Sequence, residues 1–485
     1  MKKRFIQAVV LFFAVTLLLV TLAACGGSGS QTTTTAAATT AANAGDAAAT
    51  TQAAADEPVT ITWWHRGSST EHYVNKFIVP EYNKLHPNVT IDAQLMGNDY
   101  ANSLRMAIAA GTGPDMFEVG TGLGYMNVTA AAEAGQIQSL QSLMNDPELD
   151  IINKMEASLL ELKKEQYNGE MYCFPMYKAF YLLVVNKDLF AKAGLDVDAN
   201  PPTTFQEVAS MAKTISDAGN GEFYGFGLHL GQANILYRTI DMMESMAGGG
   251  LYGFNYNTNR FDFTPHKEYM DIFAQMKKDG GIMPGESTTD VEMVRTHFNQ
   301  GKIAMYIDGS WAPYQYDTTQ MQNDFEWGLV NMPTLEGKTK SQGYGYYNME
   351  YCISSTTEYT DICLDIYKFM ILNELKLMTD FALAPAAYTA DPVERANATY
   401  KYNGEKIEWL IDNADNYTAF QIEPHTMITL TGDNRDIVMN NALVNTFAGD
   451  NIDFDALIQD LNTRYNAALD QALSDGTIKA EDLVR

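Results

Sequence analysis

The sequence predicts an α/β fold with two lobes, each a sheet flanked by helices. Residues 58–119 alternate strand-like and helix-like segments in a βαβαβ order, which is typical of a parallel sheet covered by helices. The same alternation returns between residues 204 and 308. Removing residues 1–24 from the 485-residue chain leaves 461, which is too long for one hydrophobic core. We therefore expect two lobes of similar architecture.

The composition of the strands and the residues that limit the helices predict the first α/β unit. Its strands are β-branched and aromatic, as in the run VTITWW. Pro80 is expected to kink or interrupt the first helix, Ser103 to cap the second, and Gly111 to end it. The expected order is a strand at 59–64, a helix near 70–85, a strand at 89–94, a helix at 103–110 and a strand at 114–119.

The second α/β unit carries a clear helix start. Thr204 and Glu207 have the spacing of a capping box, and apolar residues follow at helical spacing until Gly219, which is expected to stop the helix. A later helix through residues 291–298 closes near Gly301 and leads into a strand at 302–308.

The N-terminus has the order of a signal peptide. Three basic residues precede an apolar run, and small residues precede Cys25. A transmembrane helix is the alternative for residues 5–24. The tetrapeptide LAAC resembles a bacterial lipobox, which implies cleavage after residue 24 and lipidation of Cys25. Residues 25–57, rich in Ala, Thr and Gly, are expected to be a flexible stalk on the outer face of a membrane.

Composition narrows the class of protein. The chain is 46% apolar and 19% charged, so it is globular, and its net charge of −28 argues against nucleic-acid binding. Cys173, Cys352 and Cys363 have no CxxC spacing, so buried free thiols are expected, with a Cys352–Cys363 bridge as the alternative. The seven histidines are scattered, so we expect neither a metal site nor a cofactor.

Three segments resemble one protein family. GTGPD at residues 111–115, YNGEMY at 167–172 with VNKDLF at 185–190, and FNQGKIAM at 298–305 with DGSW at 308–311 occur in the family's order. They resemble the extracellular solute-binding proteins of ABC importers, in the branch that includes the maltose-binding protein.

The resemblance implies a two-lobed fold with a ligand cleft between the lobes. Lobe 1 would comprise residues 58–176 and 350–395, and lobe 2 residues 180–349 and 396–485, with a first crossing near 177–180. It also implies a monomeric carbohydrate receptor without enzymatic activity, which closes on its ligand and delivers it to ABC permease subunits. A lipid anchor and a stalk suit a cell that has no periplasm to confine a free binding protein. We therefore expect the protein on the surface of a Gram-positive cell.

Sugar ligands favour aromatic rings, which stack on their CH faces, and polar groups, which pair with their hydroxyls. We choose candidate residues at the ends of strands, because open α/β sheets bind ligands there. The resemblance adds further candidates and implies that Trp311 stacks on a sugar ring. Asp308 is a candidate acceptor for sugar hydroxyls, and the run GYGYY at 343–347 a candidate aromatic-lined loop. The predicted ligand contacts are Trp64, Arg66, Ser68, Ser69, Gly120, Thr121, Gly122, Tyr177, Lys178, Asp308, Trp311, Tyr344 and Tyr346.

Two alternative hypotheses about the function stay open at this point. The solute could be a polyamine, iron or a peptide instead of a sugar. A secreted glycoside hydrolase would need two carboxylates flanking the scissile bond, for which Glu118 and Asp308 are conceivable. Asp115 is expected to bind backbone amides rather than ligand.

Overall fold

The computed structural model describes residues 57–66, 73–97, 99–120, 126–155, 166–231, 236–317, 324–388, 392–401, 404–419 and 423–483. The chain divides into two units, residues 1–55 and 56–485, and all described residues belong to the second. The predicted signal peptide, Cys25 and almost all of the stalk therefore lie outside the described residues. None of the helices in the described ranges is long and apolar enough to cross a membrane.

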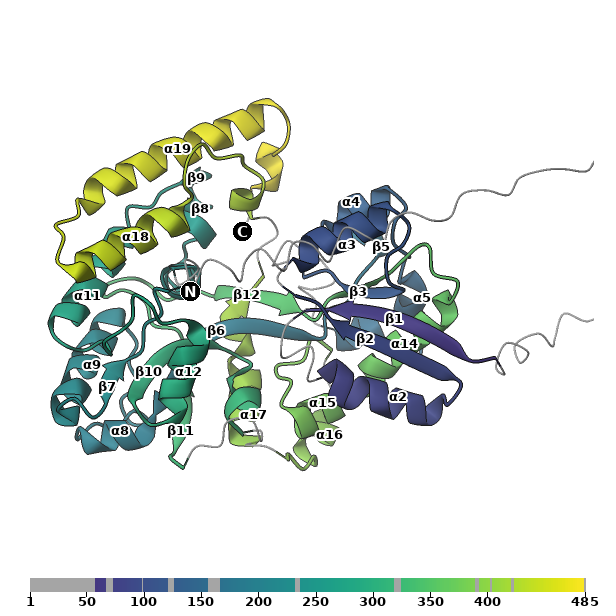
Figure 1. Ribbon diagram of the computed structural model, residues 1–485, viewed down its shortest axis with the longest axis horizontal. Coiled ribbons are helices and arrows are strands. Elements are labelled where there is room, and N and C mark those ends of the chain that lie inside the picture. Colours follow the sequence, from purple (N-terminus) through teal and green to yellow (C-terminus); the bar gives the residue numbers. More distant parts are fainter. Residues whose placement is uncertain are drawn as a thin grey trace, which may run out of the picture. The chain divides into compact units, whose positions relative to one another are not determined.

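The first sheet has four strands in the order β13-β3-β1-β2 (Figure 1). β1 pairs in parallel with both β2 and β3, which confirms the predicted parallel βαβαβ unit. β13 joins from far along the chain and pairs antiparallel with β3. The strands are β1 (Val59–His65), β2 (Val89–Leu95), β3 (Met116–Glu118) and β13 (Tyr351–Ile353).

Two helices of this unit, α2 and α3, begin at other residues than predicted. Pro80 lies in the first turn of α2, where its missing N–H is not needed, and the irregularity precedes it as the π-helical turn η1. α3 begins at Tyr100, so the predicted cap Ser103 is wrong: its N–H already donates to Asp99 O (3.0 Å) inside the helix. Gly111 ends α3 with φ +68°, as predicted. The elements are η1 (Val74–Ile78), α2 (Val79–Leu85), α3 (Tyr100–Ala109), α4 (Val128–Glu133), α5 (Gln141–Met144), α6 (Ile151–Lys154), α14 (Thr360–Leu372), α15 (Glu374–Phe381), α16 (Pro392–Ala396) and the hairpin β4 (Gln166–Tyr167) with β5 (Glu170–Met171).

The second sheet has six strands in the order β14-β12-β6-β10-β7, with β11 also paired to β6. β10 is parallel to β7, whereas β10, β11 and β12 are all antiparallel to β6. The second sheet therefore mixes parallel and antiparallel strands, whereas the βαβαβ part of the first sheet is parallel. Its strands are β6 (Tyr177–Asn186), β7 (Tyr224–Phe226), β10 (Ile303–Gly309), β11 (Trp327–Val330), β12 (Gly343–Asn348) and β14 (Tyr417–Thr418).

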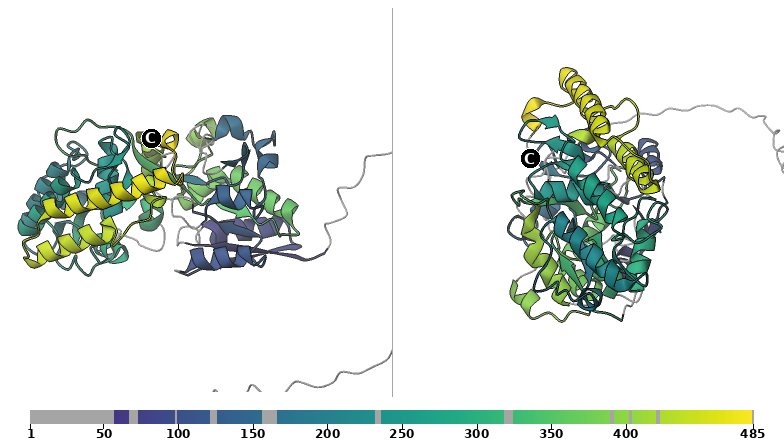
Figure 2. Two further views of the ribbon diagram at one scale, coloured as in Figure 1. Left: turned by 90° about the horizontal axis from the view of Figure 1, so that it is seen from above. Right: turned by 90° about the vertical axis from the view of Figure 1, so that its left-hand side faces the viewer.

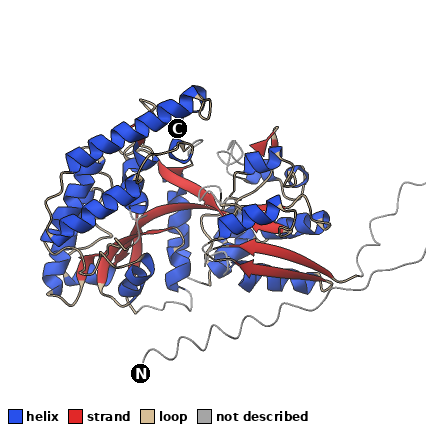
Figure 3. Cartoon of the chain, turned by 45° about the horizontal axis from the view of Figure 1, so that its top comes forward, coloured by secondary structure: helices blue, strands red, loops and turns tan. Residues whose placement is uncertain are grey.

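Helices pack against this second sheet, and α18 lies beside α19 (Figures 2 and 3). The predicted capping box is present at the start of α9: Thr204 Oγ1 accepts from Glu207 N (3.2 Å), and Glu207 Oε2 accepts from Thr204 N (3.0 Å). α9 includes Gly219 and is ended by Asn220, which is left-handed at φ +45°. The remaining elements are α8 (Lys187–Lys192), α9 (Phe205–Gly219), η4 (Tyr237–Asp241), α10 (Met242–Met246), η5 (Leu251–Gly253), β8 (Phe254–Asn255), β9 (Arg260–Phe261), α11 (His266–Lys278), α12 (Val291–Asn299), α13 (Ala312–Asp317), α17 (Gly404–Asn413), η6 (Ala414–Asn416), η7 (Pro424–Thr426), α18 (Arg435–Ala448), α19 (Phe454–Ser474) and η8 (Ala480–Asp482).

Three chain segments meet where the crossing is predicted. The start of β6 pairs with the end of β12, and β12 continues through residues 349–350 into β13 of the other sheet. A third segment is held there by the hydrogen bonds Lys178 N to Pro385 O (3.0 Å) and Ala387 N to Met176 O (3.0 Å). The lobe ranges themselves stay predictions.

The cysteines are buried among apolar side chains. Cys173, Cys352 and Cys363 are all free thiols, so the alternative Cys352–Cys363 bridge is wrong. Burial raises the pKa of the Cys363 thiol to about 12, which makes it an unreactive core residue.

Candidate functional site

The carboxyl ends of β1 and β3 bring the first group of predicted residues together. The two strands are in register at Trp64 and Phe117, so Arg66 and Gly120 leave the sheet at one edge. Trp63 is fully buried against Tyr351, with ring centroids 4.8 Å apart at 86°, whereas Trp64 points to the other face and is half-buried.

Glu118 fixes the loop that follows β1. Its carboxylate is buried and accepts a hydrogen bond from Arg66 N (2.7 Å). Gly120 has φ +49°, a conformation that favours glycine. The remaining predicted contacts at this edge, Ser68, Ser69, Thr121 and Gly122, lie outside the described residues.

Asp115 is a structural residue, as expected. Its carboxylate accepts from Thr62 N (2.8 Å), Thr62 Oγ1 (2.7 Å) and Thr357 Oγ1 (2.6 Å), and thereby ties β1 to the segment after β13.

The second group of residues is built around Asp308 at the carboxyl end of β10. Its buried carboxylate accepts two hydrogen bonds from Arg295 (Nε 2.8 Å, Nη2 2.6 Å) and one each from Tyr306 Oη (2.8 Å), Gly309 N (2.9 Å) and Trp311 Nε1 (3.1 Å). Burial alone would lower the pKa of Arg295, but the adjacent Asp308 carboxylate outweighs it, and the pKa of Arg295 is raised.

These contacts correct the prediction for Asp308. Five donors already occupy its two oxygens, so the carboxylate does not fit the expected role of accepting sugar hydroxyls. Asp308 instead positions Trp311, whose indole N–H it holds. The same contacts engage Asp308, one of the two carboxylates of the hydrolase hypothesis, and Arg66 N donates to the other, Glu118.

Trp311 follows β10 and is half-buried, so part of its indole is accessible. The ring lies directly over Gly309: a Cβ at that position would come 2.2 Å from indole carbons. Its edge-to-face partner is Tyr181 of β6, at 5.4 Å between centroids and 82° between planes. A glycine, a carboxylate and a tyrosine therefore fix the orientation of this ring.

Tyrosine rings continue from Tyr181 across the sheet. Tyr346 lies 6.4 Å from Tyr181, Tyr344 stacks on Tyr346 at 6.0 Å, and Tyr237 of η4 stands edge-on to Tyr181 at 6.0 Å. Sequence reasoning missed Tyr181 and Tyr237. The alternation along the crossing strand could have indicated Tyr181, because it lies on the same side of a strand as Tyr177.

The run GYGYY is not a loop, which corrects another prediction. Residues 343–348 form β12, and Tyr344 and Tyr346 are only 1% and 5% exposed. Tyr344 Oη donates to Glu423 Oε1 (2.7 Å). Tyr344 is therefore a buried residue that packs against Tyr346, and Tyr346 lies between Tyr344 and Tyr181.

Tyr177 and Lys178 lie at the start of β6 and are also buried. Asn348 Nδ2 donates to Tyr177 Oη (3.0 Å). Tyr177 lies close enough to Tyr346 and to Tyr351 to contribute to the raised pKa of each, although burial is the larger cause in both. Both predicted contacts are therefore buried at the start of the crossing strand.

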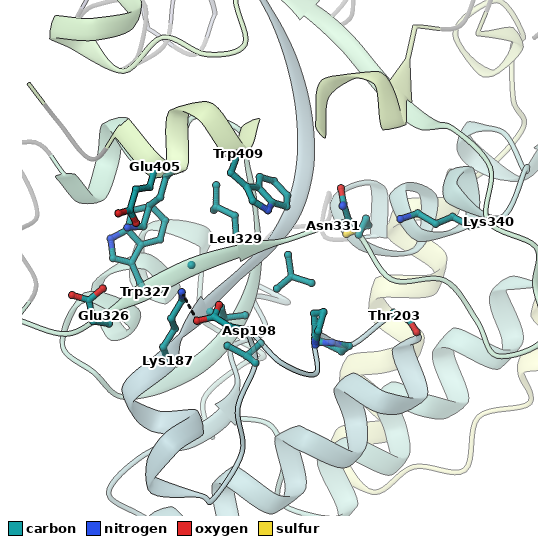
Figure 4. Close-up of a pocket in the computed structure, with 18 residues that line it drawn as sticks. Lys187, Asp198, Thr203, Glu326, Trp327, Leu329, Asn331, Lys340, Glu405 and Trp409 are labelled. Atoms are coloured by element: carbon teal, nitrogen blue, oxygen red, sulfur yellow. Dashed lines mark hydrogen bonds and ion pairs between the residues drawn. The ribbon is translucent and has the colours of Figure 1, made fainter. Parts of the chain in front are cut away.

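A separate cavity of about 400 Å³ lies at the opposite end of β6 (Figure 4). Lys187, the first residue of α8 after the strand, pairs with Asp198 (2.7 Å) on one side, and Lys406 lies 4.3 Å over the ring of Trp327 on another. Trp409 also lines this cavity. The cavity shares no residue with the cluster around Trp311.

A half-buried indole, a row of tyrosines and several buried polar groups lie together on a fold with two sheets linked by crossing strands. This is the arrangement predicted above for a binding protein of the two-sheet α/β type. The chain matches the bacterial extracellular solute-binding protein family over residues 67–374, which is more than half of its length. It belongs to that family.

Curated relatives and solved structures agree with this assignment. A binding protein of Brucella abortus is 27% identical over 265 residues, covering 54% of this chain and 59% of that protein. The sn-glycerol-3-phosphate-binding periplasmic protein UgpB of Agrobacterium fabrum is 24% identical over 292 residues, covering 57% and 62%. The match thus spans about three fifths of the relatives' own length.

Among solved structures, the solute-binding protein RafE in complex with raffinose has a TM-score of 0.62 at 19% identity, covering 84% of this chain and 99% of RafE. The GacH receptor of Streptomyces glaucescens has a TM-score of 0.64 at 15% identity, covering 88% and 100%. At these identities the likeness establishes the two-lobed solute-binding fold.

Proposed function

We propose that this protein is the substrate-binding component of an ABC importer and captures a sugar or oligosaccharide outside the cell. The observation that carries the proposal is the fixed, half-buried indole of Trp311, held by Asp308 and Tyr181 at a strand end. A rigid aromatic face next to polar groups suits a sugar ring. The ligands named for RafE and GacH, raffinose and acarbose, are carbohydrates and support this class.

The proposed mechanism is capture by closure. The first group of residues, around Trp64 and Arg66, and the second, around Trp311, would contact the ligand together only in a closed state. A ligand that contacts both groups shifts the equilibrium toward that state, which the permease subunits then recognise. This requires no nucleophile and no proton relay.

The proposal includes attachment to the membrane. Cys25 after the sequence LAA would be lipidated, and residues 25–57 would serve as a stalk on the outer face of the cytoplasmic membrane. Several acyl chains hold a protein on a membrane far better than one, because each buried CH₂ adds about 0.8 kcal/mol. Metabolic labelling with a fatty acid, lost in Cys25→Ala, tests this part.

A thermal-shift screen tests the ligand class. A ligand at about 100 times its dissociation constant adds about 2.7 kcal/mol to the free energy of unfolding, which for a chain of this size raises the Tm by about 3 °C. We expect a shift with one class of sugar that is lost in Trp311→Ala. A response only to polyamines, amino acids or ferric citrate would overturn the carbohydrate proposal, and consumption of the sugar would contradict a pure binding role.

A further inference from the structure

Arg238 of η4 is a half-buried cation beside the aromatic cluster. Its guanidinium carbon lies 5.8 Å from the centre of the Tyr181 ring. Its Nε and Nη1 atoms are buried, and no group accepts a hydrogen bond from either of them among the described residues. An arginine side chain stays charged, and its N–H groups are unfavourable when they are buried without an acceptor.

The two arginines that are buried in this sheet and its helices show the usual arrangement. Arg295 is paired with Asp308 (2.6 Å) and Glu292 (2.6 Å), and Arg435 is paired with Asp241 and Asp436. The fold therefore supplies carboxylates to these cations but none within ion-pair distance of Arg238 in the ranges described.

The Asp308 carboxylate, at the end of β10, is already paired with Arg295 and also accepts from Trp311. Glu423 accepts from Tyr344 Oη (2.7 Å). Neither carboxylate forms an ion pair with Arg238 in the ranges described.

Two further polar atoms of this lobe lack partners. His229 Nε2 and Ser310 Oγ are buried without hydrogen-bond partners among the described residues. Burial, and then the charge of Arg238, lower the pKa of His229 to about 3, so the ring is neutral. Because Gly227 N donates to Met305 O (2.8 Å) between parallel strands, His229 comes level with the end of β10, where Ser310 and Trp311 follow.

We propose that the ligand carries an anionic group, a carboxylate or a phosphate, which Arg238 binds with Ser310 beside it. The inference rests on the proposed function, because it places this group on the solute that stacks on Trp311. The planar guanidinium matches both oxyanions in a bidentate way. Neutral hydroxyls could accept its hydrogen bonds but would leave the charge uncompensated. The solute class is thus an acidic sugar or a polyol phosphate.

Calorimetric titration of the full chain with matched probe pairs tests this. One pair is oligogalacturonides against neutral galacto-oligosaccharides, and the other is sn-glycerol 3-phosphate against glycerol. We expect one anionic probe to bind at least tenfold more tightly than its neutral partner, and the pair that responds tells carboxylate from phosphate. Arg238→Gln should abolish the preference, Arg238→Lys should keep part of it, and Arg105→Gln, on the exposed surface of α3, should keep all of it.

The outcomes separate this inference from the proposed function. Neutral sugars that bind as tightly as their acidic partners, in both the wild type and Arg238→Gln, would overturn the anionic group and leave the sugar receptor standing. Absence of binding to every probe would contradict both. The Tm without ligand gives a second readout: Arg238→Gln should match or exceed the wild type, and a lower Tm would show that Arg238 is a structural cation.

Discussion

Asp308 and Trp311 act as one unit at the scale of single residues. The carboxylate is 0% exposed and receives five hydrogen bonds, of which one fixes the indole. Two of the five come from Arg295, so the same carboxylate neutralises a buried cation and orients a ring. Removing Asp308 therefore changes both stability and the site.

Asp308→Ala should lower the free energy of unfolding by about 3–5 kcal/mol, because it leaves the Arg295 guanidinium buried without its main partner. Urea denaturation measures the loss. The double variant Asp308→Leu with Arg295→Met removes both charges and should recover much of the stability. A cost of less than about 1 kcal/mol for Asp308→Ala would show that the pair is not what holds this strand end.

Trp311→Ala should weaken ligand binding at least tenfold while changing the Tm of the unliganded protein little, because the ring is only half-buried. Titration calorimetry measures the affinity. Trp409→Ala is the matched control, since Trp409 is also half-buried but lines the separate cavity. Equal losses in the two variants would contradict the placement of the site at Trp311.

At the scale of elements, local interactions decide some helix ends, and tertiary pairing decides where some strands form. The capping box at Thr204 and the glycine at residue 111 were predicted correctly, because both depend on interactions within a few residues. The cap at Ser103 was wrong, since α3 starts at Tyr100. The run GYGYY has turn-like glycines yet forms β12, because pairing with β6 outweighs local preference.

Thr204→Ala should destabilise the protein by about 1 kcal/mol through loss of the N-cap of α9. The hydrogen bonds that Glu207 accepts from the backbone of Thr203 and Thr204 hold its pKa below the usual value, so the box is formed at neutral pH. Chemical denaturation at neutral pH measures the change, with Thr204→Ser as a control that keeps the hydroxyl. A Ser variant as unstable as the Ala variant would argue against capping as the cause.

At the scale of the whole molecule, buried neutral histidines link stability to pH. Burial lowers the pKa of His229 and of His425 to about 3, with nearby arginines adding to the effect. In the unfolded chain each would titrate near 6.5. Their contribution to stability is therefore complete above about pH 6.5 and is lost as the pH falls toward 3.

His229→Gln isolates one of these contributions. Between about pH 7.5 and pH 5, the wild type should lose about 2 kcal/mol more of its free energy of unfolding than the variant, because only the wild-type unfolded chain gains a proton at this position. Urea denaturation at the two pH values provides the measurement. Parallel losses in the two proteins would mean that His229 is protonated in the folded state.

Closure is the second prediction at this scale. If the two groups of residues share one ligand, small-angle scattering should show a smaller radius of gyration at saturating ligand, and Trp311→Ala should show no change at the same concentration. An unchanged radius in the liganded wild type would remove the main support for capture by closure.

The sequence by itself determined the family, the α/β class, the parallel βαβαβ part of the first sheet and Trp311 as a candidate, because motif order, strand composition and capping depend on residues close together in the chain. It could not determine that Asp308 is already bonded by Arg295, that Tyr181 stands between Trp311 and Tyr237, or that two N–H groups of Arg238 are buried without an acceptor among the described residues. Those facts join β6, η4, α12 and β10, which are up to about 130 residues apart. Only the tertiary fold brings such residues into contact, and hydrogen bonding and charge compensation depend on contact rather than on residue type.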